Sequence, residues 1–201
     1  MARLKSEPEI RVVTYRPPRF LYQMPSAVFG AVGAGVFNPA TGGFVGGTAG
    51  DPRGQVVAID SPLEDPAIQV RNSFIKGVAG HLDAARLVQA GEPLPDDDVE
   101  ALRKKFGGGV ALDFKTTTWG LLSSSLITVP YQVVYFGRSR LLRLSDGRVL
   151  WQGQCQYDGR YPGANLDQFK ANSTPVLKEK FGEAAESCAR ELLTQFLDTQ
   201  K

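Results

Sequence analysis

Five side chains are the candidates in this sequence for binding a ligand or transferring a proton. Asp113, Trp119, Tyr131 and Tyr135 fall on or beside predicted strands, and His81 is the single histidine of the chain. A buried carboxylate beside a tyrosine can act in acid–base chemistry, and a tryptophan can line a ligand groove. We therefore keep a small-ligand carrier or an enzyme with a sheet-edge pocket as an alternative function, with Trp119, Tyr131 and Tyr135 as its candidate pocket.

No complete catalytic or metal-binding pattern accompanies these residues. His81 has no second histidine and no cysteine nearby, which favours a surface or helix-capping role. The serines at 123–125 lack both a GxSxG pattern and a base partner. The carboxylates at 96–98 do not have calcium-loop spacing and suit the start of a helix. The sequence therefore predicts no catalytic residue, no metal ligand and no cofactor.

The uncharged segment FGAVGAGVFNPATGGFVGGTAG, residues 29–50, is the most unusual stretch of the chain. Its glycines do not form a dinucleotide fingerprint, and no Lys–Ser/Thr pair follows them as in a phosphate-binding loop. The uncharged run extends from Phe20 to Gly50, and Pro25 and Pro39 interrupt it, which disfavours one membrane-spanning helix. Two interpretations stay open: a surface hairpin or loop, or a segment that orders against a membrane or partner. The candidate contact residues are Gly30, Gly33, Phe37, Gly42, Phe44, Gly46 and Gly50.

The elements that would position these residues indicate an α+β fold. Alternating apolar residues predict strands, Asp146–Gly147 predicts a hairpin turn, and Asp65 with Pro66 predicts a helix start. We expect a mainly antiparallel sheet of about four strands with helices packed on one face. Residues 1–54 would form an N-terminal strand and the glycine-rich segment, and residues 55–201 the α+β domain. The expected strands are 9–15, 56–59, 85–89, 110–119, 131–144 and 148–157, and the expected helices are 65–82, 98–106, a short one ending at 172, and one from 174 to about 196.

Composition limits the class of protein. The chain has 201 residues, 42% of them apolar, which suits a globular protein. A net charge of +2 without a lysine and arginine cluster does not predict nucleic-acid binding. The start, MARLKSEPEI, has no apolar signal region. We expect either a cytoplasmic protein or an exported one whose leader is absent from this chain.

The two cysteines distinguish these compartments. Cys155 lies on the last predicted strand, and Cys188 lies on the apolar stripe of the last predicted helix. If this helix packs back on its own hairpin, the two sulfur atoms can meet. A disulfide would indicate an oxidising compartment such as the periplasm. Two buried thiols in a cytoplasmic protein are the alternative, and the spacing alone does not decide between them.

The order of motifs along residues 60–198 resembles a group of uncharacterised lipoproteins of Gram-negative bacteria. The matching segments are DPAIQVRNSFIKGVAGHL, DDDVEALRKKF, VALDFKTTTWGLL, YQVVYFGRSRLLRLSDGRVLWQGQC and LKEKFGEAAESCARELL. The resemblance implies export, a lipidated cysteine on an N-terminal tether, a small periplasmic α+β domain and a Cys155–Cys188 disulfide. It implies no enzyme activity and no known site. This chain lacks the lipobox cysteine, so an anchor would require a leader beyond it.

From these features we expect a non-catalytic periplasmic domain, tethered to the outer membrane, that binds an envelope protein or a membrane surface. The absent catalytic pattern, the cysteine pair and the uncharged segment favour this function over the enzyme or ligand carrier. A pocket on which Asp113, Tyr131 and Tyr135 converge would favour the alternative.

Overall fold

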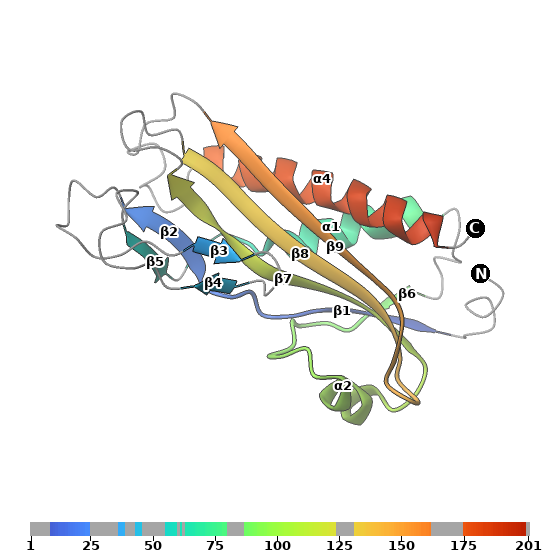
Figure 1. Ribbon diagram of the computed structural model, residues 1–201. Coiled ribbons are helices and arrows are strands. Elements are labelled where there is room, and N and C mark those ends of the chain that lie inside the picture. Colours follow the sequence, from blue (N-terminus) through green and yellow to red (C-terminus); the bar gives the residue numbers. More distant parts are fainter. Residues whose placement is uncertain are drawn as a thin grey trace.

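The computed structural model describes residues 9–24, 36–38, 43–45, 55–59, 61, 63–79, 87–123, 131–161 and 175–199 (Figure 1). His81, Gly30, Gly33, Gly42, Gly46, Gly50 and the short helix expected before residue 172 lie outside these ranges. The strands are β1 (Ile10–Thr14), β2 (Phe20–Met24), β3 (Val36–Asn38), β4 (Gly43–Val45), β5 (Gln55–Ile59), β6 (Leu87–Gln89), β7 (Val110–Ser123), β8 (Tyr131–Arg143) and β9 (Arg148–Tyr161). The helices are α1 (Pro66–Val78), α2 (Val99–Phe106) and α4 (Pro175–Asp198).

The fold is α+β, as expected. The main sheet has seven strands and is mixed, so the expectation of about four mainly antiparallel strands undercounts the strands and leaves out the parallel pairings of β1, β2 and β6. Strands β7, β8 and β9 form an antiparallel meander, and the β8–β9 part of it is the predicted hairpin. The other edge of β7 carries two short strands in succession, β1 along its first residues and β2 near its end, both parallel to it. β6 then pairs parallel to β1, and β5 pairs antiparallel to β2.

Local signals in the sequence account for the ends of several elements. The Asp65 side chain accepts a hydrogen bond from the Ala67 amide and caps α1, as predicted. Asp98 caps α2 in the same way by accepting from the Ala101 amide. Gly147 has a φ of 72° in the turn between β8 and β9, a conformation that glycine adopts at little cost. These three predictions are confirmed.

Two helices cover one face of the sheet, and α2 covers part of the other (Figure 1). The apolar stripe of α4, which includes Phe181, Cys188 and Phe196, packs with α1 against β7, β8 and β9 and forms the larger core. A smaller core lies on the opposite face, where Leu102 of α2 meets Val13, Ala111 and Leu142. The expectation that all helices lie on one face is therefore wrong for α2, because its single buried side chain, Leu102, serves this second cluster.

The glycine-rich segment lies between two strands that pair with each other. β2 and β5 run antiparallel, and their last described pair joins Met24 to Gln55. Within the segment, β3 and β4 form a separate antiparallel pair in which Phe37 lies opposite Phe44. The part that the structure describes therefore includes a hairpin carrying two of the candidate contact residues.

Candidate functional site

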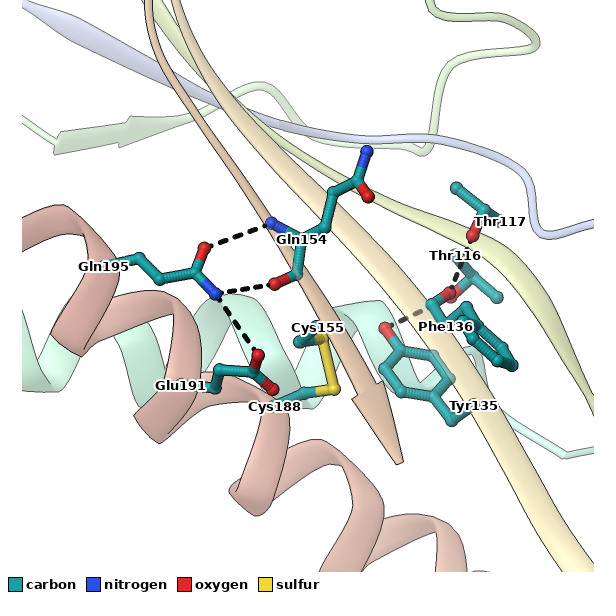
Figure 2. The surroundings of a disulfide bond; sticks show 9 residues. All are labelled: Thr116, Thr117, Tyr135, Phe136, Gln154, Cys155, Cys188, Glu191 and Gln195. Carbon is teal, nitrogen blue, oxygen red and sulfur yellow. Dashed lines mark hydrogen bonds between the residues drawn. A yellow bond between two sulfur atoms is a disulfide. The ribbon is translucent and has the colours of Figure 1, made fainter. Parts of the chain in front are cut away.

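A disulfide joins the sheet to the longest helix. Cys155 of β9 and Cys188 of α4 are bonded through their sulfur atoms, and their Cα atoms are 5.2 Å apart (Figure 2). Both residues are almost fully buried in the larger core. The prediction that α4 packs back on its own hairpin is confirmed, and the alternative of two free thiols does not apply.

A glutamine beside the disulfide occupies the free edge of β9. The Gln154 amide donates to Oε1 of Gln195 at 3.2 Å, and Nε2 of Gln195 donates to the Gln154 carbonyl at 2.8 Å (Figure 2). Both backbone groups face away from β8. The Gln195 side chain thus makes the pair of bonds that a neighbouring strand would make. It covers this point of an edge that no other strand covers in the described part of the chain.

Asp113 belongs to a buried ion pair on the α2 face of the sheet. Its carboxylate is 0% exposed and accepts hydrogen bonds from the Tyr15 hydroxyl at 2.8 Å and from Arg140 Nη2 at 2.6 Å. The Arg140 backbone amide and Nε also donate to it. Burial, followed by the charge of Asp113, raises the pKa of Tyr15, so the phenol stays protonated. Because every oxygen of this carboxylate has a partner, the arrangement is structural rather than poised for proton transfer.

Asp97, in the segment before α2, extends this cluster toward the surface. It accepts from Lys115 at 2.6 Å and from Arg138 at 2.7 Å, and its backbone carbonyl accepts from Arg140. Burial opposes ionisation of Asp97, but the hydrogen bonds from Lys115 and Arg138 outweigh it and lower its pKa to about 2. The cluster ties the loop before α2 to β7 and β8.

A β-bulge places two of the candidate residues on β7, Asp113 and Trp119, on opposite faces of the sheet. The register of β7 against β8 shifts between Thr116 and Thr118, which moves the following side chains to the opposite face. Asp113 therefore faces α2, whereas Trp119 faces α1 and α4. Tyr135, directly opposite Trp119 on β8, faces the same way, and both are buried in the larger core. Trp119 packs edge-on against Phe20 and Phe181. The backbone of Tyr131 pairs with Ser123 and Tyr161, and its side chain lies outside the described part.

Tyr135 meets a different carboxylate from the one considered in the sequence. The Thr116 hydroxyl donates to Oδ1 of Asp65 and lies 3.5 Å from the Tyr135 hydroxyl (Figure 2 shows the second contact). Since Thr116 has one hydroxyl proton, Tyr135 is left to donate to Thr116. The chain of donors runs from Tyr135 through Thr116 to Asp65. Burial, and then the charge of Asp65, raises the pKa of Tyr135.

Asp65 stands beside a pocket of about 290 Å³ between the start of α1 and the first half of α4. The pocket is lined by residues 63–66 and Gln69 on one side and by Lys178, Phe181 and Gly182 on the other. Asp65 is 7% exposed, and burial raises its pKa to about 6. Its Oδ1 accepts two hydrogen bonds, and its Oδ2 has no partner in the described part of the chain.

Sequence reasoning recognised Asp65 only as a helix cap and missed its place in this pocket. The sequence signal for Asp65 is the Asp–Pro pair at the start of α1. This pair predicts that one carboxylate oxygen caps the helix, and it does not predict what surrounds the other oxygen. The sequence indicates Asp97 only as one of the acidic residues at the start of a helix. Its ion pairs with β7 and β8 join residues far apart in the chain, so the neighbouring sequence does not predict them. Within the described residues, no group of three or more potential metal ligands occurs.

No family model and no curated protein match this chain. Among solved structures it is similar to a DUF330 protein from Xanthomonas campestris, with 12% identity, a TM-score of 0.41 and coverage of 98% of this chain and 91% of that chain. The PelC dodecamer from Paraburkholderia phytofirmans gives 12% identity, a TM-score of 0.39 and coverage of 93% and 87%. A lipoprotein from Neisseria meningitidis gives 17% identity, a TM-score of 0.30 and coverage of 62% and 86%.

Lipoproteins of Gram-negative bacteria thus occur among the similar structures, as the motif order led us to expect. Since all three TM-scores lie below 0.5, the function is inferred from the residues of this chain.

Proposed function

We propose that this chain is a non-catalytic domain of the bacterial periplasm, tethered to the outer membrane, that binds an envelope protein or a membrane surface. The observation that carries the proposal is the Cys155–Cys188 disulfide in the larger core. Disulfides form and persist in oxidising compartments and are rare in the cytosol. The motif order that resembles exported lipoproteins supports the same compartment.

The contact surface in this proposal is the uncharged segment between β2 and β5. The backbone of Phe37 pairs with that of Phe44 in its hairpin, and two aromatic residues in an uncharged segment suit an apolar partner or the membrane interface. No helix in the described part of the chain has the length and apolar character to cross a membrane. The proposal assigns the contact to the hairpin formed by β3 and β4.

The compartment is tested by trapping the thiol state in bacterial cells. Cells that produce the protein with an export leader are quenched in acid, and the denatured protein is treated with a maleimide-linked polyethylene glycol. We expect no mass addition without reductant and two additions after reduction. Two additions without reductant would contradict an oxidised, exported protein.

The contact surface is tested by replacing residues 25–54 with the turn Asn–Gly, which joins Met24 directly to Gln55. Because these two residues already pair, the circular dichroism spectrum and melting temperature should be retained. We expect loss of co-sedimentation with phosphatidylethanolamine–phosphatidylglycerol vesicles, or loss of a crosslinked envelope protein; the first result identifies a membrane surface and the second a protein.

A double variant of the hairpin and a single-site control make this test more specific. Phe37→Ser with Phe44→Ser should reproduce the loss, while Val149→Ser, at an apolar side chain exposed on β9, should not. Unchanged sedimentation and crosslinking in both the turn replacement and the double phenylalanine variant would remove the segment as the contact surface.

A further inference from the structure

The pocket between α1 and α4 combines an apolar wall with an excess of negative charge. Leu63, Pro66 and Phe181 supply the apolar part. The lining also includes two acidic residues, Glu64 and Asp65, and one basic residue, Lys178. A volume of about 290 Å³ suits a small molecule rather than a polypeptide. This lining is complementary to a small cation that carries an apolar body.

Asp65 adds an unmet hydrogen-bonding requirement to this pocket. Buried polar atoms in folded proteins have partners almost without exception, and an exception calls for a specific cause. Oδ2 of Asp65 is buried without a partner in the described part of the chain, although Oδ1 accepts from Ala67 and Thr116. Capping α1 uses only one carboxylate oxygen, Oδ1. The cap therefore does not explain why Oδ2 is buried without a hydrogen-bond donor among the described residues. A donor held in the pocket would supply the missing partner.

We propose that this pocket binds a small ligand with a protonated amine, in which Asp65 is the counter-ion and Phe181 contacts the apolar body. A cation over an aromatic face gains further attraction. The site is separate from the hairpin at Phe37 and Phe44 and goes beyond the proposed envelope-binding function. A negative result for the pocket would therefore leave the envelope-binding function standing, and a negative result for that function would leave the pocket proposal standing.

The test uses two probes of nearly equal size and shape, phenethylammonium and 2-phenylethanol. Each is titrated into the purified, disulfide-bonded protein at pH 7.5 while amide shifts are followed by NMR. We expect saturable shifts at Ala67 and Gly182 with phenethylammonium. Binding of 2-phenylethanol should be about tenfold weaker, since a charge-assisted hydrogen bond exceeds a neutral one by roughly that factor.

Matched variants assign the effect to Asp65. Asp65→Asn keeps a residue that caps helices well but removes the charge, and it should abolish the preference for the ammonium probe. Asp98→Asn makes the same exchange at the cap of α2 and should leave the preference unchanged. Lys178→Gln, at an exposed side chain, should tighten ammonium binding by about two- to fivefold.

Four results would overturn the proposal. Equal affinity for both probes would show an apolar pocket without charge recognition. Absence of saturable shifts would show a pocket that holds solvent only. A preference that survives in Asp65→Asn would place the counter-ion elsewhere. If Asp65→Asn fails to fold, the Lys178→Gln variant decides, and unchanged or weaker ammonium binding then overturns the proposal.

Discussion

Gln195 of α4 holds both backbone polar groups of Gln154, accepting from the amide at 3.2 Å and donating to the carbonyl at 2.8 Å. Gln154 lies next to the disulfide residue Cys155, on a strand whose outer edge has no neighbouring strand among the residues that the structure describes. The helix is therefore fixed to this edge by one covalent link and two hydrogen bonds at adjacent positions.

Replacing Gln195 by Ala should expose the edge of β9 at Gln154. We expect hydrogen exchange at the Gln154 amide to accelerate by about fivefold or more, because a lost hydrogen bond is worth roughly 1 kcal/mol or more. Self-association measured by sedimentation should also rise, since an open edge can pair with another chain. Gln152→Ala, at an exposed side chain two residues away, is the control. Unchanged exchange at Gln154 would mean that the side-chain bonds do not protect this edge.

Removal of the disulfide by Cys155→Ala with Cys188→Ala should lower the free energy of unfolding by about 3–4 kcal/mol. The bond closes a loop of 33 residues, and the entropy of that loop in the unfolded chain gives this magnitude. Urea unfolding of the variant and of the reduced wild type measures the loss. Midpoints that match those of the oxidised wild type would show that core packing alone holds α4 on β9.

Asp113→Asn should destabilise the protein by about 3–5 kcal/mol, because it leaves the buried Arg140 cation without its counter-charge. Tyr15→Phe removes a single hydrogen bond to the same carboxylate and should cost about 1.5–3 kcal/mol. Asp146→Asn, at an exposed carboxylate in the β8–β9 turn, is the control in the same denaturant series. A loss for Asp113→Asn no greater than that of the control would contradict the structural role of this ion pair.

Stability should fall as the pH rises from about 4 to about 7 because of Asp65. Its pKa is raised from 3.8 to about 6 by burial, so the folded state holds a proton that the unfolded state has already released in this window. By linkage, this one group lowers the free energy of unfolding on the order of 3 kcal/mol across the window. The groups that face it are Glu64, Thr116, Tyr135 and, across the pocket, Lys178.

Asp65→Asn should flatten that slope, because its side chain does not titrate and it can still cap α1. Urea midpoints measured from pH 4 to pH 7 provide the test, with Asp98→Asn as the matched exchange. Asp97, whose pKa is lowered to about 2, stabilises the fold above about pH 4 and affects only the range below it. A slope that is equal in wild type and Asp65→Asn would assign the pH dependence to another group.

Features that depend on neighbouring residues were predictable from the sequence. The caps at Asp65 and Asp98 and the turn at Gly147 follow from short-range geometry that a few residues determine. That the Cys155 and Cys188 sulfur atoms could meet followed from one additional assumption, that the last helix packs on the preceding hairpin; the bond between them was implied by the resemblance. The apolar stripe of α4 supported this assumption because it fits one face of a sheet.

Features that join distant segments were not predictable in the same way. Nothing local to β1 or β2 indicates that both lie along β7, about 100 residues away. The bulge at Thr117 has no sequence signal of its own, and without it Asp113 and Trp119 would share a face. The pocket at Asp65 was missed for the same reason, since it forms only where α1 meets α4.

The pairing of Met24 with Gln55 has a practical consequence for engineering. β2 ends beside the start of β5. The sheet therefore fixes the two points that the intervening peptide connects but does not fix the length of that peptide. Foreign sequences such as an epitope tag or a fluorescent reporter can be grafted at this position. The same tolerance would let evolution lengthen, shorten or exchange the insert while the host framework is preserved.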